Sequence, residues 1–387
     1  MNMNKKIMAL EGLRGIAFLG VFFSHSNAFD NRLSCLGAGG VSIFLILTGF
    51  VMMYSYYGKN RITNVSLKDN FLFAKKKIQR LYLLHVICTV AMVPFMMFGN
   101  DAESIPTILL NIVLNLLLIQ SWFPIKGGSI NGVSWYLCVT VFSYFLFPYI
   151  LHYIEKGYSI KKAIRMIFIC LLIMISVALL GLGMSVAASS HNILWMEYLS
   201  TALVSSFPLS RIFDTIIGIN LGYIFINYEG KIVKRYCSYG EICGVFLAVT
   251  ANICMDVFVK HPSYNVTDRA WYTTEYWYNY AYVFIYCIGA MVLIYSFAQE
   301  KGAISGILTN KITLYLARIS PYAYLIHYVV FRYLAFVLYH FPVGIIAQSQ
   351  QEVLKLWGVV NITVGLVITV ILSEICIYVN KRLQRFL

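Results

Sequence analysis

Long apolar runs, separated by short polar stretches, follow one another along nearly the whole chain. An α-helix needs roughly 17–25 predominantly apolar residues to cross a bilayer, and ten of the runs offer at least about that length. The pattern therefore predicts an all-α polytopic membrane bundle of about ten transmembrane helices, which forms a single domain over residues 1–387. The predicted spans are residues 8–25, 39–57, 81–98, 133–153, 164–187, 212–228, 241–259, 278–298, 312–338 and 354–379.

An eleventh apolar run, residues 105–123, is flanked by acidic residues and prolines. Lys and Arg concentrate in residues 58–80, which the positive-inside rule places in the cytoplasm. If residues 105–123 crossed the membrane, the basic stretches 155–165 and 380–387 would lie on the other side and break that rule. We therefore predict a re-entrant or interfacial segment here, with both termini in the cytoplasm.

The composition agrees with a membrane protein. Hydrophobic residues make up 60% of the chain and charged residues 12%, against about 25% charged residues in soluble proteins. The net charge of +14 comes from Lys and Arg between the apolar runs, so it indicates orientation in a membrane rather than nucleic-acid binding. The nine cysteines show neither metal-ligand spacing nor a disulfide framework. We expect a multi-pass protein of the plasma or inner membrane, surrounded by lipid, without a metal or a nucleic-acid partner.

The first apolar run, residues 8–25, carries three ionisable residues. In a helix, Arg14 and His25 fall on one face, which Glu11 shares, and lie about 16 Å apart. Ionisable groups within a span are costly to bury and usually functional. A guanidinium binds phosphate or carboxylate in a bidentate manner, and histidine, with a pKa near neutrality, can act as a general base on a hydroxyl. The alternative is that Arg14 and His25 only extend to the two membrane surfaces.

A basic cluster lies at the predicted cytoplasmic edge of the third span. Arg80 follows Lys76 by four residues and Lys77 by three, which places the three side chains on one face of a helix. Such a face can hold a polyanionic cofactor such as coenzyme A. The alternative is an anchor that only keeps the loop in the cytoplasm.

Two further segments place polar and aromatic side chains near the start of a span. Asn131, Ser134 and Trp135 form the entry to one span, and Tyr324 and His327 belong to residues 317–327, at the start of another. Each group suits either a substrate site or hydrogen bonding between helices.

In their order along the chain, these segments resemble the acyltransferase-3 family of integral membrane acyltransferases, over essentially the whole chain. The family's first span carries an acidic residue, then Arg, then ten residues and His, which Glu11, Arg14 and His25 match. The other matching positions are residues 40–50 in the second span, Lys77 and Arg80, Arg211, Gly218 and Gly222, and residues 319–327.

Three positions depart from the family pattern. Thr48 stands where Ser is usual, and Leu83 stands where Pro is usual. Family members commonly carry Trp-Ser-Leu-x-x-Glu, and Thr140 occupies the position of that Glu. With no acidic residue at position 140, Glu11 in the first span is the acidic residue available to the predicted site.

The resemblance implies an enzyme, a membrane O-acyltransferase. It would move an acetyl group from cytoplasmic acetyl-CoA to a hydroxyl of a cell-surface glycan (capsule, exopolysaccharide or O-antigen) or of its lipid-linked precursor. His25 would be the base, Arg14 would orient the pantetheine or phosphate end of the donor, and Glu11 would neutralise Arg14 when the donor is absent. The coenzyme A phosphates would be held by Lys76, Lys77 and Arg80, and the acceptor side lined by Asn131, Ser134, Trp135, Tyr324 and His327.

Two other functions remain as alternatives. A transporter or flippase for a glycan lipid also uses an apolar bundle with charges inside the membrane, but it predicts substrate movement without consumption of acetyl-CoA. The missing acid at Thr140 suits a catalytically inactive membrane scaffold.

Overall fold

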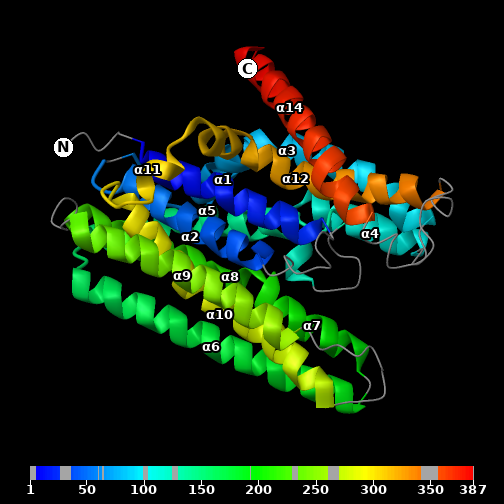
Figure 1. Cartoon of the computed structure of the whole chain (residues 1–387), viewed down its shortest axis with the longest axis horizontal. Helices are drawn as coiled ribbons and strands as arrows, with labels where there is room; N and C mark the ends of the chain where they lie inside the picture. Colours follow the sequence, from blue (N-terminus) through cyan, green and yellow to red (C-terminus); the bar gives the residue numbers. More distant parts are fainter. Residues whose placement is uncertain are drawn as a thin grey trace.

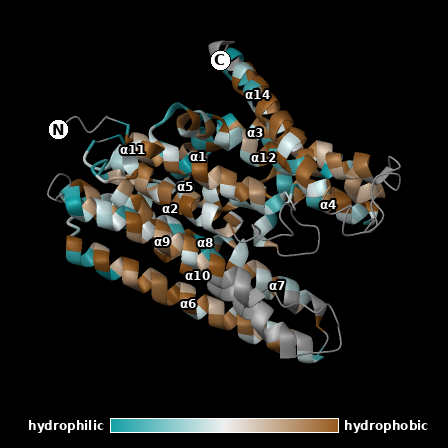
Figure 2. Cartoon of the chain, viewed as in Figure 1, coloured by the Kyte–Doolittle hydropathy of each residue, from teal (hydrophilic) through white to brown (hydrophobic). Residues whose placement is uncertain are grey.

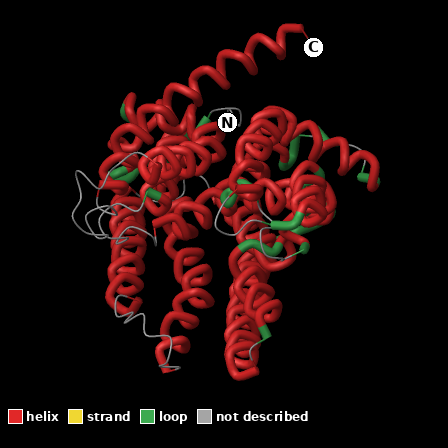
Figure 3. Tube along the Cα trace, turned by 90° about the vertical axis from the view of Figure 1, so that its right-hand side faces the viewer, coloured by secondary structure: helices red, strands yellow, loops and turns green. Residues whose placement is uncertain are grey.

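The apolar runs fold into α-helices throughout the part of the chain that the computed structural model describes, and that part contains no β-strand (Figure 3). The described residues are 6–26, 36–59, 61–62, 65–98, 103–123, 130–191, 193–228, 234–259, 270–340 and 356–386. The long helices are α1 (Met8–His25), α2 (Leu36–Tyr56), α3 (Leu67–Phe98), α5 (Trp135–Glu155), α6 (Ile160–His191), α8 (Pro208–Tyr228), α9 (Lys234–Val259), α10 (Ala270–Ala298), α12 (Lys311–His340) and α14 (Leu366–Phe386), which continues the π-helical turn η4 (Asn361–Gly365). The short helices are α4 (Ile105–Leu116), the 3₁₀ turn η2 (Gln120–Trp122), α7 (Leu194–Ser205) and α11 (Ser305–Leu308).

The helices form the predicted all-α polytopic membrane bundle. Seven helical stretches among the described residues are both long and apolar enough to cross a membrane. Each of the ten predicted spans corresponds to one long helix. On α3 and α6, large apolar side chains such as Ile87, Val90 and Phe168 are exposed, which suits contact with lipid (Figure 2). The hydropathy pattern did not predict α7.

The segment predicted to be re-entrant enters the bundle and does not cross it. The Glu103 N–H, just before α4, donates to the Met96 carbonyl near the end of α3, and the Leu116 carbonyl at the end of α4 accepts from the Tyr82 hydroxyl. α4 therefore runs back along α3, and its 12 residues cover only about 18 Å. Because α5 begins beside the inner end of α4, the chain leaves the bundle on the side from which α3 entered.

The helices that carry the candidate site lie at the centre of the molecule (Figure 1). α1 packs between α2 and α12, and α8 packs along α2. α6, α9 and α10 form a second layer against α2 and α8, while α3 and α14 contact α12. The site helices are thus enclosed by other helices on most sides.

The N-terminal end of α1 belongs to a face of the molecule that we call the basic end. Loops from different parts of the chain meet there: the Met8 N–H donates to the Glu300 carboxylate at 2.6 Å, and the Gly58 N–H donates to the Glu155 carboxylate at 3.2 Å. The basic residues at these helix ends and loops are Lys6, Lys59, Arg61, Lys68, Lys156, Lys161, Lys162, Lys234, Arg235, Lys301 and Lys311.

Glycines allow α2 and α8 to pack backbone against backbone. A Cβ atom added to Gly218 would lie 1.9 Å from the Ile46 carbonyl oxygen, and one added to Gly49 would lie 2.1 Å from the Thr215 carbonyl oxygen. Small residues are what allow membrane helices to approach this closely.

We expect Gly218→Ala to lower the stability of the folded protein by about 1–3 kcal/mol or more, because a backbone carbonyl must move to admit the methyl group. The thermal unfolding midpoint of the purified protein in detergent measures this. Gly183→Ala on α6 is the matched control, since its Cβ would meet nothing within 4 Å. Equal midpoints for the two variants would contradict the close packing.

Candidate active site

His25 at the end of α1 lies beside His327 of α12, although 302 positions separate them in the sequence. Nδ1 of His25 is 3.3 Å from Nε2 of His327, and the ring centroids are 5.2 Å apart. The sequence predicted His25 as a base and His327 as a residue of the acceptor side. The structure brings them together as one pair, which we call the histidine pair.

The hydrogen-bond partners assign the tautomer of each ring. Nδ1 of His25 lies 2.9 Å from the Val21 carbonyl oxygen, and Nδ1 of His327 lies 3.2 Å from the Ala323 carbonyl oxygen. Because a carbonyl only accepts, each Nδ1 carries the hydrogen of the neutral ring. Nε2 of His327 can then accept from the Nδ1–H of His25. This leaves the lone pair of His25 on Nε2, where a general base needs it.

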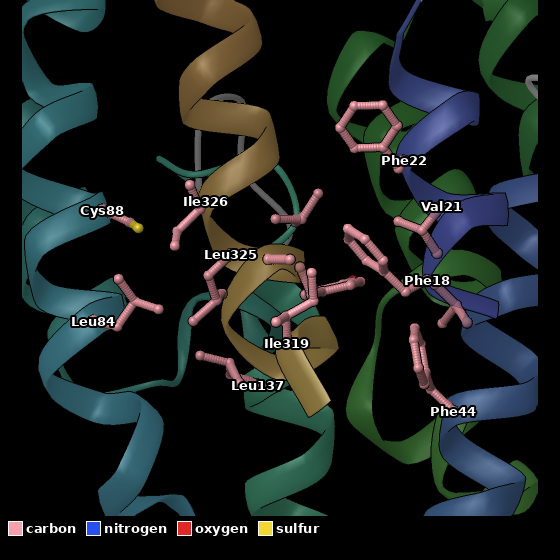
Figure 4. Packing of buried hydrophobic residues seen from close by; sticks show 14 of the residues in the cluster. Phe18, Val21, Phe22, Phe44, Leu84, Cys88, Leu137, Ile319, Leu325 and Ile326 are labelled. Carbon is pink, nitrogen blue, oxygen red and sulfur yellow. The ribbon is translucent and has the colours of Figure 1, made fainter. Parts of the chain in front are cut away.

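Aromatic rings surround His327, which is fully buried. Phe22 and Phe331 lie with their centroids 6.1 Å and 5.7 Å from the imidazole, and Tyr324 lies at 6.0 Å. Figure 4 shows Phe18 and Phe22 extending from α1 toward α12. Packing of this kind fixes the rotamer of His327, and through it the position of the His25 ring.

Toward the other end of α1, Glu11 and Arg14 form the ion pair that their spacing predicted. Arg14 Nη1 is 3.2 Å from Glu11 Oε2, and Lys6 Nζ is 3.5 Å from the same oxygen. The pair borders a cavity of about 470 Å³ between α1 and α2 that opens toward the basic end. Lys59 and Arg61, which the sequence analysis did not single out, also line this cavity.

The predicted coenzyme A cluster on α3 lies outside this cavity. Lys76 and Arg80 are exposed. The Lys77 ammonium group lies over the rings of Tyr56 and Phe73, at 4.8 Å and 5.3 Å from their centroids. The cluster and Arg14 do not line the same cavity, although the sequence predicts that both bind one donor.

Two tyrosines from α5 and α12 pack against each other within the bundle. The rings of Tyr136 on α5 and Tyr324 on α12 are 5.1 Å apart. Two of the positions that depart from the family pattern bond to the backbone of their own helix: the Thr48 hydroxyl donates to the Phe44 carbonyl and the Thr140 hydroxyl to the Tyr136 carbonyl, each at 2.7 Å. The third departure, Leu83, is exposed on α3.

The other predicted acceptor residues lie at the start of α5. Asn131 and Ser134 are fully buried, and Trp135 is half-buried. Asn131 Nδ2 donates to the Leu325 carbonyl at 3.0 Å, and Ser134 Oγ donates to Asn115 Oδ1 at 3.3 Å. Asn131 thus ties α5 to the turn of α12 that precedes His327.

Buried polar groups from the re-entrant segment continue this network. Gln120 Nε2 donates to the Ser134 carbonyl at 3.2 Å, and His85 Nε2 lies 2.8 Å from the Asn115 carbonyl oxygen. Among the described residues, Gln120 Oε1 and Asn131 Oδ1 have no hydrogen-bond partner. No local sequence pattern indicates Gln120 or His85, because their partners come from separate segments of the chain.

Arg211 and Asp214 form a second ion pair, on α8. Arg211 Nε is 3.4 Å from Asp214 Oδ2, and the side chains are 3% and 0% exposed. A buried ion pair is costly, so this one marks the polar interior of the bundle. Within the described ranges, no three His, Cys, Asp or Glu side chains gather as a metal site would require.

We expect Asn131→Ala to lower the stability by about 1–3 kcal/mol, because it leaves the buried Leu325 carbonyl without its donor. The thermal unfolding midpoint measures this, with Ser176→Ala as the control for removal of an exposed polar group on α6. An unchanged midpoint together with lost activity would instead assign Asn131 to the acceptor site.

Comparison with known proteins identifies the family of the chain. The family described as an acyltransferase domain, acyltransferase 3, matches residues 7–378. Acyltransferase MdmB of Streptomyces mycarofaciens is 28% identical over 158 residues, which are 37% of this chain and 38% of that protein. The chain thus matches less than half the length of this relative, and no solved structure gives a significant match. Because the family match extends from before Glu11 to beyond His327, the chain belongs to the acyltransferase-3 family of integral membrane acyltransferases.

Proposed function

We propose that this membrane acyltransferase is an O-acetyltransferase. It transfers an acetyl group from cytoplasmic acetyl-CoA to a hydroxyl of a cell-surface glycan or of its lipid-linked precursor. The histidine pair carries this proposal, because it presents a neutral imidazole whose Nε2 can take the proton of a hydroxyl. Family membership favours this reaction over transport or an inactive scaffold.

The orientation in the membrane follows from the basic end. Lys and Arg side chains collect on the cytoplasmic side of membrane proteins. With the basic end in the cytoplasm, α1 begins there and His25 lies toward the outer surface of a plasma or inner membrane. Arg14 then faces the side on which acetyl-CoA is present.

Transfer requires that one carbon–oxygen bond replaces one carbon–sulfur bond and that one proton moves from the acceptor to the leaving group. The acceptor oxygen bonds to the acetyl carbon while the carbon–sulfur bond of the thioester breaks. The hydroxyl proton passes to Nε2 of His25 and then to the departing sulfur, which leaves as the thiol of coenzyme A. Positioned general bases contribute roughly 10²–10⁴-fold to such reactions.

His327 positions His25 and stabilises its charged form. When Nε2 of His25 takes the proton, the Nδ1–H remains directed at the Val21 carbonyl and at Nε2 of His327. In enzymes that activate a hydroxyl, the base commonly hydrogen-bonds to a further group that orients it. His327 therefore acts through His25, without contact to the donor.

The ion pair serves the donor at the other end of α1. Arg14 and His25 are 11 residues apart, which corresponds to about 16 Å along a helix. Arg14 binds a phosphate or amide oxygen of the donor, and Glu11 balances its charge when no donor is present. The acyl-bearing arm of coenzyme A extends from there toward the histidine pair, and Tyr324 and Trp135 border the path of the acceptor.

We expect His25→Gln to reduce acetyl transfer at least 100-fold and His327→Gln to reduce it about 10–1,000-fold, with folding preserved. The double variant should be no slower than His25→Gln, because the two residues act as a unit. The assay follows labelled acetyl groups from acetyl-CoA into surface polysaccharide, with His152→Gln on the exposed face of α5 as the control.

Retained acetylation in His25→Gln would refute the assignment of the base. Movement of a glycan lipid without consumption of acetyl-CoA would establish the transporter alternative. Multiplicative losses in the double variant would contradict a direct link between His25 and His327.

A further inference from the structure

Another cavity, of about 440 Å³, lies between α1 and α2 on one side and α9 and α10 on the other (Figure 1). Ile304 and Leu308, at α11, complete its wall at the basic end. Its volume is within the roughly 300–1,000 Å³ of small-molecule sites. Among the described residues, no side chain lines both this cavity and the one beside Glu11 and Arg14. We call it the apolar cavity.

The walls of the apolar cavity match a hydrocarbon ligand. None of the described residues that line it is charged, and the polar side chains among them are those of Asn252 and Tyr286. The Tyr286 hydroxyl donates to Asn252 Oδ1 at 2.8 Å, and Asn252 Nδ2 donates to the Ala248 carbonyl at 2.8 Å. Both polar groups are thus engaged within the protein. Cavities with such apolar walls exclude water and bind apolar molecules.

The mouth of the apolar cavity consists of exposed apolar side chains. They are Ile16 on α1, Val245 and Val249 on α9 and Ile285 on α10, and they are 38–50% exposed. Each of these residues lies near the midpoint of its helix. Because the helices span the membrane, the mouth lies at the depth of the hydrocarbon core. Lipid tails reach this depth, whereas head groups and water-soluble molecules do not.

The cavity continues from its mouth toward the basic end, where it is closed. Leu13, Phe297 and Leu308 line it there, and all three are buried. Inside, Gly289 on α10 leaves open space, since an added Cβ would meet Ala248 of the opposite wall only at 3.8 Å. The space therefore suits the end of a flexible chain that enters from the side.

The position of the cavity on α1 distinguishes between the lipids of the membrane. At about 100° per residue, Ile16, Ala17 and Gly20 lie on the face of α1 opposite to that of Arg14 and His25. A lipid-linked acceptor bound here would therefore hold its head group on the far side of α1 from the proposed base. A phospholipid of the surrounding bilayer has no group that must reach His25.

We propose that the apolar cavity is a binding site for one acyl chain of a bilayer phospholipid, which enters through the mouth from the middle of the membrane. The bound chain completes the packing of α1 against α9 and α10, and so supports the helix that carries Arg14 and His25. This site goes beyond the proposed function and does not depend on it.

A phosphatidylethanolamine with a photoactivatable diazirine in the middle of one acyl chain tests the site. The full chain is reconstituted in phosphatidylethanolamine vesicles that contain a small fraction of this probe. After irradiation, mass spectrometry maps the cross-linked residues. We expect cross-links at Leu13, Ala290 and Leu293, which line the cavity and are buried, so that only an inserted chain reaches them. Cross-links at the exposed residues Ile87 and Phe168 report the surrounding lipid.

A variant that fills the cavity provides the comparison. We expect Gly289→Phe to reduce the cross-links at the cavity walls at least fivefold and to leave those at Ile87 and Phe168 unchanged. Gly289→Ala is the matched control, because its methyl group fits without a clash, and it should retain most of the wall cross-links. Ala248→Leu narrows the cavity from the α9 side and replaces Gly289→Phe if the thermal unfolding midpoint shows that the latter does not fold.

Two outcomes would overturn the site. One is that the wild type is cross-linked at exposed residues such as Ile87 and Phe168 but not at the cavity walls. The other is that the filled and narrowed variants are cross-linked at the walls as strongly as the wild type. Displacement of the probe by excess polyprenyl phosphate, but not by excess phosphatidylethanolamine, would refute the phospholipid and assign the cavity to the lipid-linked acceptor.

Discussion

The close contact between α1 and α12 is the constraint on which the candidate site depends. A Cβ at Gly15 would lie 2.5 Å from the Thr313 carbonyl oxygen of α12, and one at Gly12 would lie 1.9 Å from the carbonyl oxygen of Leu308, at the end of α11 just before α12. Without side chains at these positions, the two backbones approach closely enough for imidazoles from both helices to meet within the bundle. The aromatic rings around His327 then fill the remaining space, so the geometry of the histidine pair is a consequence of helix packing.

The sequence predicted what depends on local periodicity. The helical period placed Glu11 and Arg14 on one face, and the structure shows them in contact. Hydropathy and the distribution of Lys and Arg together predicted that α4 would not cross the membrane. The contact between His25 and His327 could not be predicted in this way, because it depends on how α1 and α12 pack rather than on any local pattern. For the same reason, no pattern indicated Gln120 as part of the network at the start of α5.

The basic residues show a related limit. Lys76, Lys77 and Arg80 attract attention because they are close in sequence and share a helix face. The cavity between α1 and α2 is lined by single charged residues from the start of α1 and from the turn after α2, which are far apart in sequence. A dense basic run at the edge of a membrane also has a structural use, which is to orient the helix. Enclosure among helices distinguishes a ligand site from an orienting cluster, and it requires the fold.

The absence of an acidic residue at position 140 is compatible with the proposed reaction. In a base held by a third group, that group must accept a hydrogen bond from the imidazole and tolerate the positive charge formed during proton transfer. Nε2 of His327 meets the first requirement, since its own Nδ1 is directed at the Ala323 carbonyl. The Val21 carbonyl helps with the second, because it accepts from the Nδ1 of His25 at 2.9 Å. The Thr140 hydroxyl donates to the Tyr136 carbonyl within α5, so its hydrogen bond is satisfied inside the bundle and no carboxylate is buried at this position. The proposed proton transfer thus relies on the histidine pair and the α1 backbone, and it does not need an acid from α5.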